Sequence, residues 1–318
     1  MTEIAPFIAV SLLQLVMIVI LAPLVTGIVK KTKARFQRRR GASVLQPYYD
    51  LAKLFKKEVV IPPVSSWLFR FTPYLAFSST LVIALLVPTV VAPVPLHWMG
   101  DIITVIYLFA LVRFFVALVG LDTGSAFGGL GSSREMSIAS IVEPAMMLAI
   151  FSAAGTAGST NLSVIVQKLS TTPEAMLNPA HLLAFSGLFI VTLAETGRVP
   201  VDNPATHLEL TMIHEAMILE YSGRYLAFIE WASQMKLAIF LALLSNIFFP
   251  VGIATVLTPW AVGIGVLAFL FKIGVLSLVV AAVESTNAKL RLFRVPELLM
   301  VAFILSLLAL ILYFIIGS

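Results

Sequence analysis

Eight long apolar stretches limit the fold of this chain more than any other feature of its sequence. A helix needs about 20 mostly apolar residues to cross the hydrocarbon of a bilayer, and each stretch is close to that length. We place the expected spans at 7–29, 74–92, 101–121, 138–158, 180–196, 237–257, 262–283 and 297–316. With a mean hydropathy of +1.03, the sequence predicts an all-α integral membrane protein with about eight transmembrane helices, forming one multi-pass domain over residues 1–318, and it excludes a water-soluble enzyme.

Basic residues fall almost entirely on one side of these expected spans. Of the 21 lysines and arginines, only Arg113, Lys168 and Lys272 lie within spans or on the opposite side. The positive-inside rule therefore predicts a protein of the plasma (inner) membrane with both termini outside and the long loops in the cytoplasm. The basic run 30–40, which contains Arg38, Arg39 and Arg40, is interpreted as a contact with lipid headgroups and not with nucleic acid.

The segment 42–60 alternates apolar and polar residues at helical spacing and is too polar to span. It predicts an amphipathic helix on the cytoplasmic side, between the first two spans, ended by Pro62 and Pro63. A helix packed only on the rest of the protein fits the same pattern.

Ionisable residues within or at the ends of the spans are the strongest candidates for function. A charged side chain at mid-membrane depth costs about 2.5–3.5 kcal/mol on insertion scales, so such groups are paired or face a hydrated cavity. The candidates for ion coupling are Arg113, Asp122, Glu143, Glu195, Lys272 and Glu284. Arg113 and Lys272 are possible counter-ions of the carboxylates, and static ion pairs that fix helix packing are the alternative.

The cytoplasmic loop 195–236 is acidic within a basic protein. Its acids are Glu195, Asp202, Glu209, Glu215, Glu220 and Glu230, and its bases are Arg198, Arg224 and Lys236. Spacings of three and four residues predict a helix over 205–221. Neighbouring carboxylates raise one another's pKa, which favours coupling of proton uptake to an event nearby, whereas the alternative is a solvated loop that docks on a basic partner.

Three other kinds of site are disfavoured by the sequence. His207, Glu209, His214 and Glu215 lack the spacing of a short zinc motif, so no metal site is expected. The glycines between 124 and 131 are interpreted as a flexible turn and His181 as an interfacial residue. The chain has no cysteine, so it cannot ligate an iron–sulfur cluster through thiolates, and we expect any redox centre in a partner.

Several strings carry a family resemblance over residues 20–295. They are RRRGAS with YYDLAKLFKKE, AETGRVPVD, LEYSG at 219–223, GLDTGSAFGGLGSSREM at 120–136 with VEP at 142–144, and ESTNAKLRLFR at 284–294. Together with the eight spans, they resemble the membrane-anchor subunit shared by respiratory complex I (subunit 1) and the group 4 energy-converting hydrogenases (formate hydrogenlyase subunit 4, hydrogenase-4 component C). The last two groups of strings favour the hydrogenase branch.

The resemblance implies specific roles for residues and partners. It places Glu143, Glu195, Asp202, Glu209 and Glu220 in an acidic set between a soluble redox arm and the membrane arm. Arg198 would be a companion base, and Arg134 and Glu135 would lie in a loop that faces the soluble subunits. Expected partners are hydrogenase-like large and small subunits, an iron–sulfur subunit and antiporter-like membrane subunits, with the NiFe centre and iron–sulfur clusters in those partners. Ala205 and His207 stand where relatives have further acids.

The sequence therefore predicts a non-catalytic subunit that couples redox chemistry in its partners to movement of H⁺ or Na⁺. Two alternatives stay open. One is the quinone-site subunit of a complex I-type dehydrogenase, and the other is a stand-alone ion transporter, for which inverted repeats would be expected.

Overall fold

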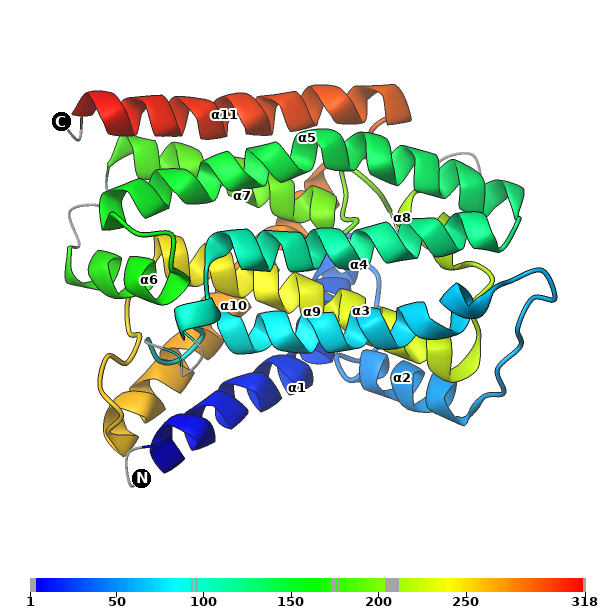
Figure 1. The fold of residues 1–318 in the computed structure, drawn as a ribbon, viewed down its shortest axis with the longest axis horizontal. Coiled ribbons are helices and arrows are strands. Elements are labelled where there is room, and N and C mark those ends of the chain that lie inside the picture. The colour runs from blue at the N-terminus through cyan, green and yellow to red at the C-terminus, as the bar shows by residue number, and fades with distance from the viewer. Residues whose placement is uncertain are drawn as a thin grey trace.

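Helices account for nearly all of the regular structure in the computed structural model, which describes residues 4–92, 94, 97–172, 176, 178–203 and 212–316. The elements are shown in Figure 1: α1 (Ile4–Phe36), α2 (Gln46–Lys56), α3 (Trp67–Leu86), η1 (His97–Met99), α4 (Ile102–Asp122), α5 (Ala126–Ala157), α6 (Leu162–Thr171), α7 (Pro179–Glu195), α8 (His214–Ile218), α9 (Gly223–Phe248), α10 (Pro259–Thr286), η3 (Leu292–Arg294) and α11 (Val295–Ile316).

The prediction of an all-α membrane protein is confirmed. Within the described residues, seven helices are long and apolar enough to cross a membrane: α1, α3, α4, α5, α9, α10 and α11. The remaining expected span is α7, an apolar helix of 17 residues. About 17 residues is the lower limit for a span, so crossing of the membrane by α7 stays a prediction.

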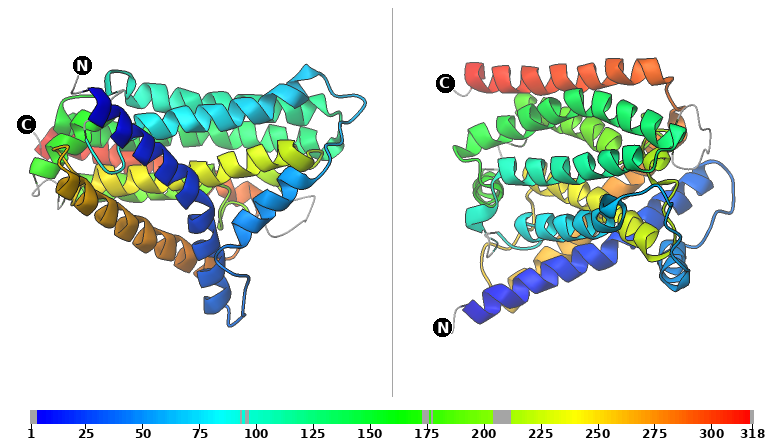
Figure 2. Two further views of the ribbon diagram at one scale, coloured as in Figure 1. Left: turned by 90° about the horizontal axis from the view of Figure 1, so that it is seen from below. Right: turned by 45° about the vertical axis from the view of Figure 1, so that its right-hand side comes forward.

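Helix α9 lies at the centre of the bundle. Every residue from Leu237 to Phe248 is buried, so this half of the helix is enclosed on all sides, and it is apolar around its circumference except at Ser245 and Asn246. Helices α3, α1, α10 and α7 pack around it, and α11 packs on the outside against α5 and α7. In Figure 2, α1 and α10 diverge from the bundle, and the C-terminal end of α1 projects beside α2.

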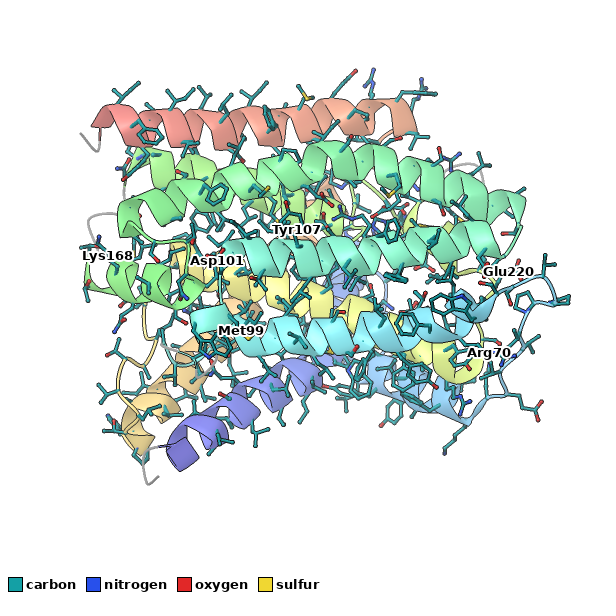
Figure 3. All side chains as sticks on the ribbon, viewed as in Figure 1. Arg70, Met99, Asp101, Tyr107, Lys168 and Glu220 are labelled. Carbon is teal, nitrogen blue, oxygen red and sulfur yellow. The ribbon has the colours of Figure 1, made fainter. Side chains whose placement is uncertain are left out.

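The two ends of the bundle differ in character. The first turns of α1 and the last turns of α11 lie at the same end (Figure 1). Figure 3 places Lys168 at this end and Arg70 and Glu220 at the opposite end, near α2 and α8. The basic run and the segment after α7 therefore share one end of the molecule, and both termini point to the other.

Several helix ends differ from the predicted spans. Helix α5 begins at Ala126 and not near residue 138, and α9 begins at Gly223 and not near residue 237. The predicted loop 195–236 therefore ends at Ser222. Of the predicted helix 205–221, residues 205–211 lie outside the described residues, and the rest is helical only over His214–Ile218. These early turns carry charged residues, which hydropathy assigns to loops but which the fold pairs inside the bundle.

The predicted glycine turn is also wrong, because Gly128, Gly129 and Gly131 lie in the first turns of α5. Gly128 packs on the backbone of Gly120 in α4, and a side chain at Gly131 would meet the Cβ of Ala216 in α8 at 2.8 Å. Small residues here let three helices approach closely. His181, predicted at an interface, is buried at 4% exposure and contacts the backbone oxygen of Phe248 through Nε2 at 3.1 Å.

Helix α3 is followed by buried, non-helical backbone. After α3, residues 87–92 are buried, and they pair with Ala254 through hydrogen bonds of 3.0 Å. The Gln14 side-chain oxygen accepts hydrogen bonds from the backbone N–H of Thr89 and Val90, and Asn246 donates to the carbonyls of Pro88 and Thr89. Non-helical backbone is tolerated at membrane depth only where protein groups satisfy it in this way.

Candidate functional site

Arg113, in the middle of α4, is the centre of a buried charge cluster. Its guanidinium contacts Glu143 and Glu195, and its Nε lies 3.3 Å from Glu135 Oε1. Glu135 and Glu143 are eight residues apart on α5, so both face α4, while Glu195 ends α7. The planar guanidinium offers five donors, so one arginine can pair with several carboxylates at once.

Lys236 from α9 adds a second cation to this cluster. Its Nζ lies 2.6 Å from Glu195 Oε2 and over the ring of Phe109. Glu195 therefore lies between two bases, with its side chain only 2% exposed. Glu143 is the more accessible acid, with 34% of its side chain exposed. Buried ions persist only where such pairing offsets desolvation, which explains why these charges occur together.

Asp202, in the segment after α7, forms a second centre. Its Oδ1 accepts from Lys289 Nζ at 2.7 Å, and its Oδ2 accepts from the backbone N–H groups of Ile213 and His214 at 3.2 and 3.3 Å. Burial alone would raise the pKa of this carboxyl. The hydrogen bond from Lys289 and the positive charges of His214 and Lys289 outweigh burial and hold that pKa well below its usual range.

His214, the first residue of α8, lies between the two centres. Its Nε2 is 3.3 Å from Glu135 Oε2 and its Nδ1 is 3.7 Å from Asp202 Oδ2. Burial disfavours the imidazolium, but the carboxylates of Glu135 and Asp202 more than compensate, so the pKa of His214 is raised above its ordinary value. The ring therefore favours its charged form between two acids.

Glu284 links three segments that are distant in sequence. Its two oxygens accept from Lys33 of α1 at 2.9 Å and from Arg198, after α7, at 3.1 Å. Since Glu284 lies near the end of α10, this carboxylate holds α1, α10 and the segment after α7 together at the end of the bundle where α1 carries its basic residues.

A cavity of about 810 Å³ connects these groups. Its charged lining residues are Lys30, Lys33, Arg39, Arg113, Glu135, Glu195, Arg198, Asp202, His214, Glu215, Glu230, Lys236 and Glu284. Burial, followed by repulsion from Glu230, raises the pKa of Glu215 to about 7. A cavity lined by ionised groups favours water and mobile protons over an apolar filling.

Other predicted site residues lie apart from this cavity. Asp122 accepts the backbone N–H of Ser66 at 2.8 Å, and Lys272 contacts the oxygens of Asn246 and Phe249 at 2.6 and 3.2 Å. The proposal that Lys272 is a counter-ion of the carboxylates is therefore wrong for the described residues. Lys272 belongs to α10, and its ammonium group lies at the C-terminal end of α9, where helix carbonyls attract cations.

Four further charged residues lie at the surface and do not line the cavity. Arg38, Arg40, Glu220 and Arg224 are exposed, with Arg224 over the ring of Tyr225. Glu209 and His207 lie outside the described residues. Among the residues that the structure describes, no group of three His, Asp or Glu side chains could hold a metal ion.

Arg134 and Glu135 require a correction, because they lie on α5 and not in a loop. The Glu135 residue is 4% exposed and its carboxylate pairs with Arg113 inside the bundle, and Arg134 donates to the carbonyl of Met212 at 2.8 Å. Four partners of the acids are not identified as such by the sequence: Lys33, Lys236, Lys289 and His214. The charges of the lysines are visible in the sequence, but basic residues in loops are equally explained as topology signals.

Comparison with known proteins matches residues 8–315 to the NADH dehydrogenase family. Formate hydrogenlyase subunit 4 of Escherichia coli (strain K12) is 37% identical over 287 residues, which cover 90% of this chain and 92% of that protein. Hydrogenase-4 component C of the same organism is 35% identical over 299 residues, covering 94% and 93%.

The fold has a counterpart in the structure of the membrane-bound sulfane sulfur reductase (MBS), an archaeal respiratory membrane complex. One of its chains matches with a TM-score of 0.76 and 19% identity, covering 95% of this chain and 99% of that chain. Since the sequence match to the family extends over nearly the whole chain, this multi-pass membrane protein belongs to the NADH dehydrogenase family.

Proposed function

We propose that this chain is the membrane-anchoring and coupling subunit of a multi-subunit complex of the energy-converting hydrogenase or formate hydrogenlyase type. It would link redox chemistry in a soluble arm to movement of H⁺ or Na⁺ in the membrane arm. Its similarity to formate hydrogenlyase subunit 4 and hydrogenase-4 component C supports this choice of complex.

The coupling part of the proposal rests on the ion pairs along the cavity. A series of ion pairs runs along the cavity from Lys289 and Asp202, through His214 and Glu135, to Arg113 and its other carboxylates. Adding or removing one charge at either end changes the electrostatic energy of every neighbour, because buried charges are weakly screened. Events next to the segment after α7 would in this way change the protonation of Glu143.

The soluble arm would supply the redox centres. The chain has no cysteine, so the NiFe centre and iron–sulfur clusters belong to hydrogenase-like large and small subunits and an iron–sulfur subunit. Antiporter-like membrane subunits would carry the ion. We place the complex in the plasma (inner) membrane, with the basic end of this chain, including Arg39 and Arg134, in the cytoplasm beside the soluble arm.

Glu143→Gln tests the coupling role. The variant keeps the size of the side chain and removes its charge, so we expect an assembled complex with a wild-type redox rate and lost ion movement. The measurement is dye-reported ion movement in vesicles that contain the purified complex, driven by a reduced viologen. Glu297→Gln, on the exposed first turn of α11, is the matched control. Wild-type redox and transport rates in Glu143→Gln would contradict the mechanism.

A quinone site is the second candidate function. The family match and the cavity support it, because about 300–1,000 Å³ is usual for small-molecule sites. The ionised lining argues against an apolar ligand. Quinone reduction by the native assembly, extracted in mild detergent, would favour this function. Nickel together with iron in the same preparation would favour the hydrogenase-type complex.

A further inference from the structure

Among the described ion pairs, only those of His214 join the Arg113 cluster to the Asp202–Lys289 pair. On one side Glu135 belongs to the Arg113 cluster, and on the other Asp202 is paired with Lys289. The two ring nitrogens address different carboxylates, at 3.3 Å for Nε2 and 3.7 Å for Nδ1. Histidine alone among side chains can accept a proton at one atom and release one from another near neutral pH.

Within the part of the chain that the structure describes, the hydrogen-bonding capacity of the His214 ring is unused. Neither ring nitrogen makes a hydrogen bond with the described residues, and Glu135 Oε2 is likewise unbonded. The ring packs on Gly197, where an added Cβ would lie 3.0 Å from Nδ1, and it borders the cavity. Hydrogen bonds of this kind span about 2.7–3.2 Å, so a small rotation brings either nitrogen into bonding range of its carboxylate.

We propose that His214 transfers protons between the carboxylates of Glu135 and Asp202 and so joins the Arg113 cluster to the Asp202–Lys289 pair. This inference rests on the proposed coupling function and names the residue through which the coupling passes.

The transfer balances without any further reactant. Neutral His214, protonated on Nδ1, takes a proton on Nε2 from the carboxylic acid of Glu135 and becomes an imidazolium. The imidazolium then releases its Nδ1 proton to the carboxylate of Asp202. One proton has moved from Glu135 to Asp202, and the ring is neutral with its proton on Nε2. Loss of that proton to water in the adjoining cavity and uptake of another at Nδ1 restore the first tautomer.

The charges around the ring favour the first step and oppose the second. Glu135 on α5 and Asp202 after α7 favour the imidazolium, while Lys236 on α9 opposes it. Arg113 on α4 acts through Glu135, Lys289 acts through Asp202, and Glu215 follows His214 on α8. Release to Asp202 is uphill while Lys289 stays paired with that carboxylate, so the second step requires the Asp202–Lys289 pair to loosen.

His181 shows how a histidine without this role is placed. It is buried in α7, its Nε2 contacts the backbone oxygen of Phe248, and its ring packs against Phe248. No carboxylate of the described residues forms an ion pair with it. His181→Gln is therefore the matched control for substitutions at His214.

The test uses the purified complex in vesicles, driven by a reduced viologen, with dyes that report H⁺ and Na⁺. For His214→Ala we expect a wild-type redox rate and H⁺ movement lowered by about 10²-fold, the low end for a positioned proton-transfer group. Because the adjoining cavity has room for a free ring, added imidazole should restore H⁺ movement, and thiazole, which has a similar shape but is far less basic, should not. His214→Gln, which fills the space, should lose transport without rescue.

The outcomes distinguish failure of the His214 relay from failure of the proposed coupling function. Wild-type H⁺ movement in His214→Gln, or equal rescue of His214→Ala by thiazole, would overturn the relay. If His214→Ala does not assemble, His214→Gln decides alone against His181→Gln. Wild-type vesicles that move Na⁺ but no H⁺ would also overturn the relay and leave the coupling function intact. Wild-type vesicles that turn over without moving any ion would overturn the proposed function itself.

Discussion

The carboxyl group of Glu215 is buried in a way that disfavours its charged form. Its carboxyl borders the cavity without an ion pair among the described residues, and burial and Glu230 raise its pKa from an ordinary 4.5 to about 7. A raised carboxyl pKa means that the folded protein prefers the neutral acid. Its contribution to stability is complete below about pH 4.5 and is lost as the pH rises through about 7.

Glu215→Gln should therefore stabilise the protein in a pH-dependent way. A shift of this size corresponds to about 3 kcal/mol in favour of the variant at about pH 8, and to none at about pH 4. Thermal unfolding in detergent at both pH values measures this difference. Glu220→Gln is the control, because that side chain is exposed. Equal stabilisation by Glu215→Gln at both pH values would contradict the assignment.

Charge pairing at the residue scale was only partly predictable. The sequence singles out Arg113, Glu143 and Glu195, because ionised groups inside spans are rare and must be compensated. It could not assign the partners, since Lys33 and Glu284 meet across 251 residues of chain. One sequence shows which charges need compensation, and only the fold shows which groups supply it.

At the scale of the elements, hydropathy predicted the spans but not all of their ends. Helix α9 begins 14 residues before the predicted span because its first turns carry Glu230 and Lys236 into the cavity. Helix α3 instead ends early, at Leu86 before Pro88, because Gln14 and Asn246 satisfy the extended backbone that follows. Such compensation comes from helices distant in sequence, and local patterns do not reveal it.

Gln14→Leu should destabilise this extended segment. It removes the acceptor for the backbone N–H groups of Thr89 and Val90, and each buried donor left unpaired costs about 1–3 kcal/mol. We expect a lower thermal midpoint in detergent for Gln14→Leu than for the wild type. Gln167→Leu, at an exposed position on α6, makes the same chemical change and should have little effect. Equal midpoints for the two variants would contradict this account.

At the scale of the whole molecule, both chain termini lie at one end and the basic residues of α1 and α2 at the other (Figure 1). With the positive-inside rule, this arrangement predicts that tags at either terminus face outward. Protease added to intact spheroplasts should remove tags at both ends, while a tag inserted at the exposed residues 38–43 should be cut only after the membrane is opened. Cleavage of the internal tag in intact cells would reverse the orientation.

The carboxylates that pair with Arg113 emerge from the ribosome after it, at different times. Glu143 follows Arg113 by 30 residues, and Glu195 follows it by 82. If α4 and α5 enter the bilayer as a hairpin, the nascent chain brings the arginine and its first counter-ion in together. The pair between Lys33 and Glu284 closes only when α10 has been made, so the lining of the cavity is incomplete until the chain has been synthesised beyond Glu284.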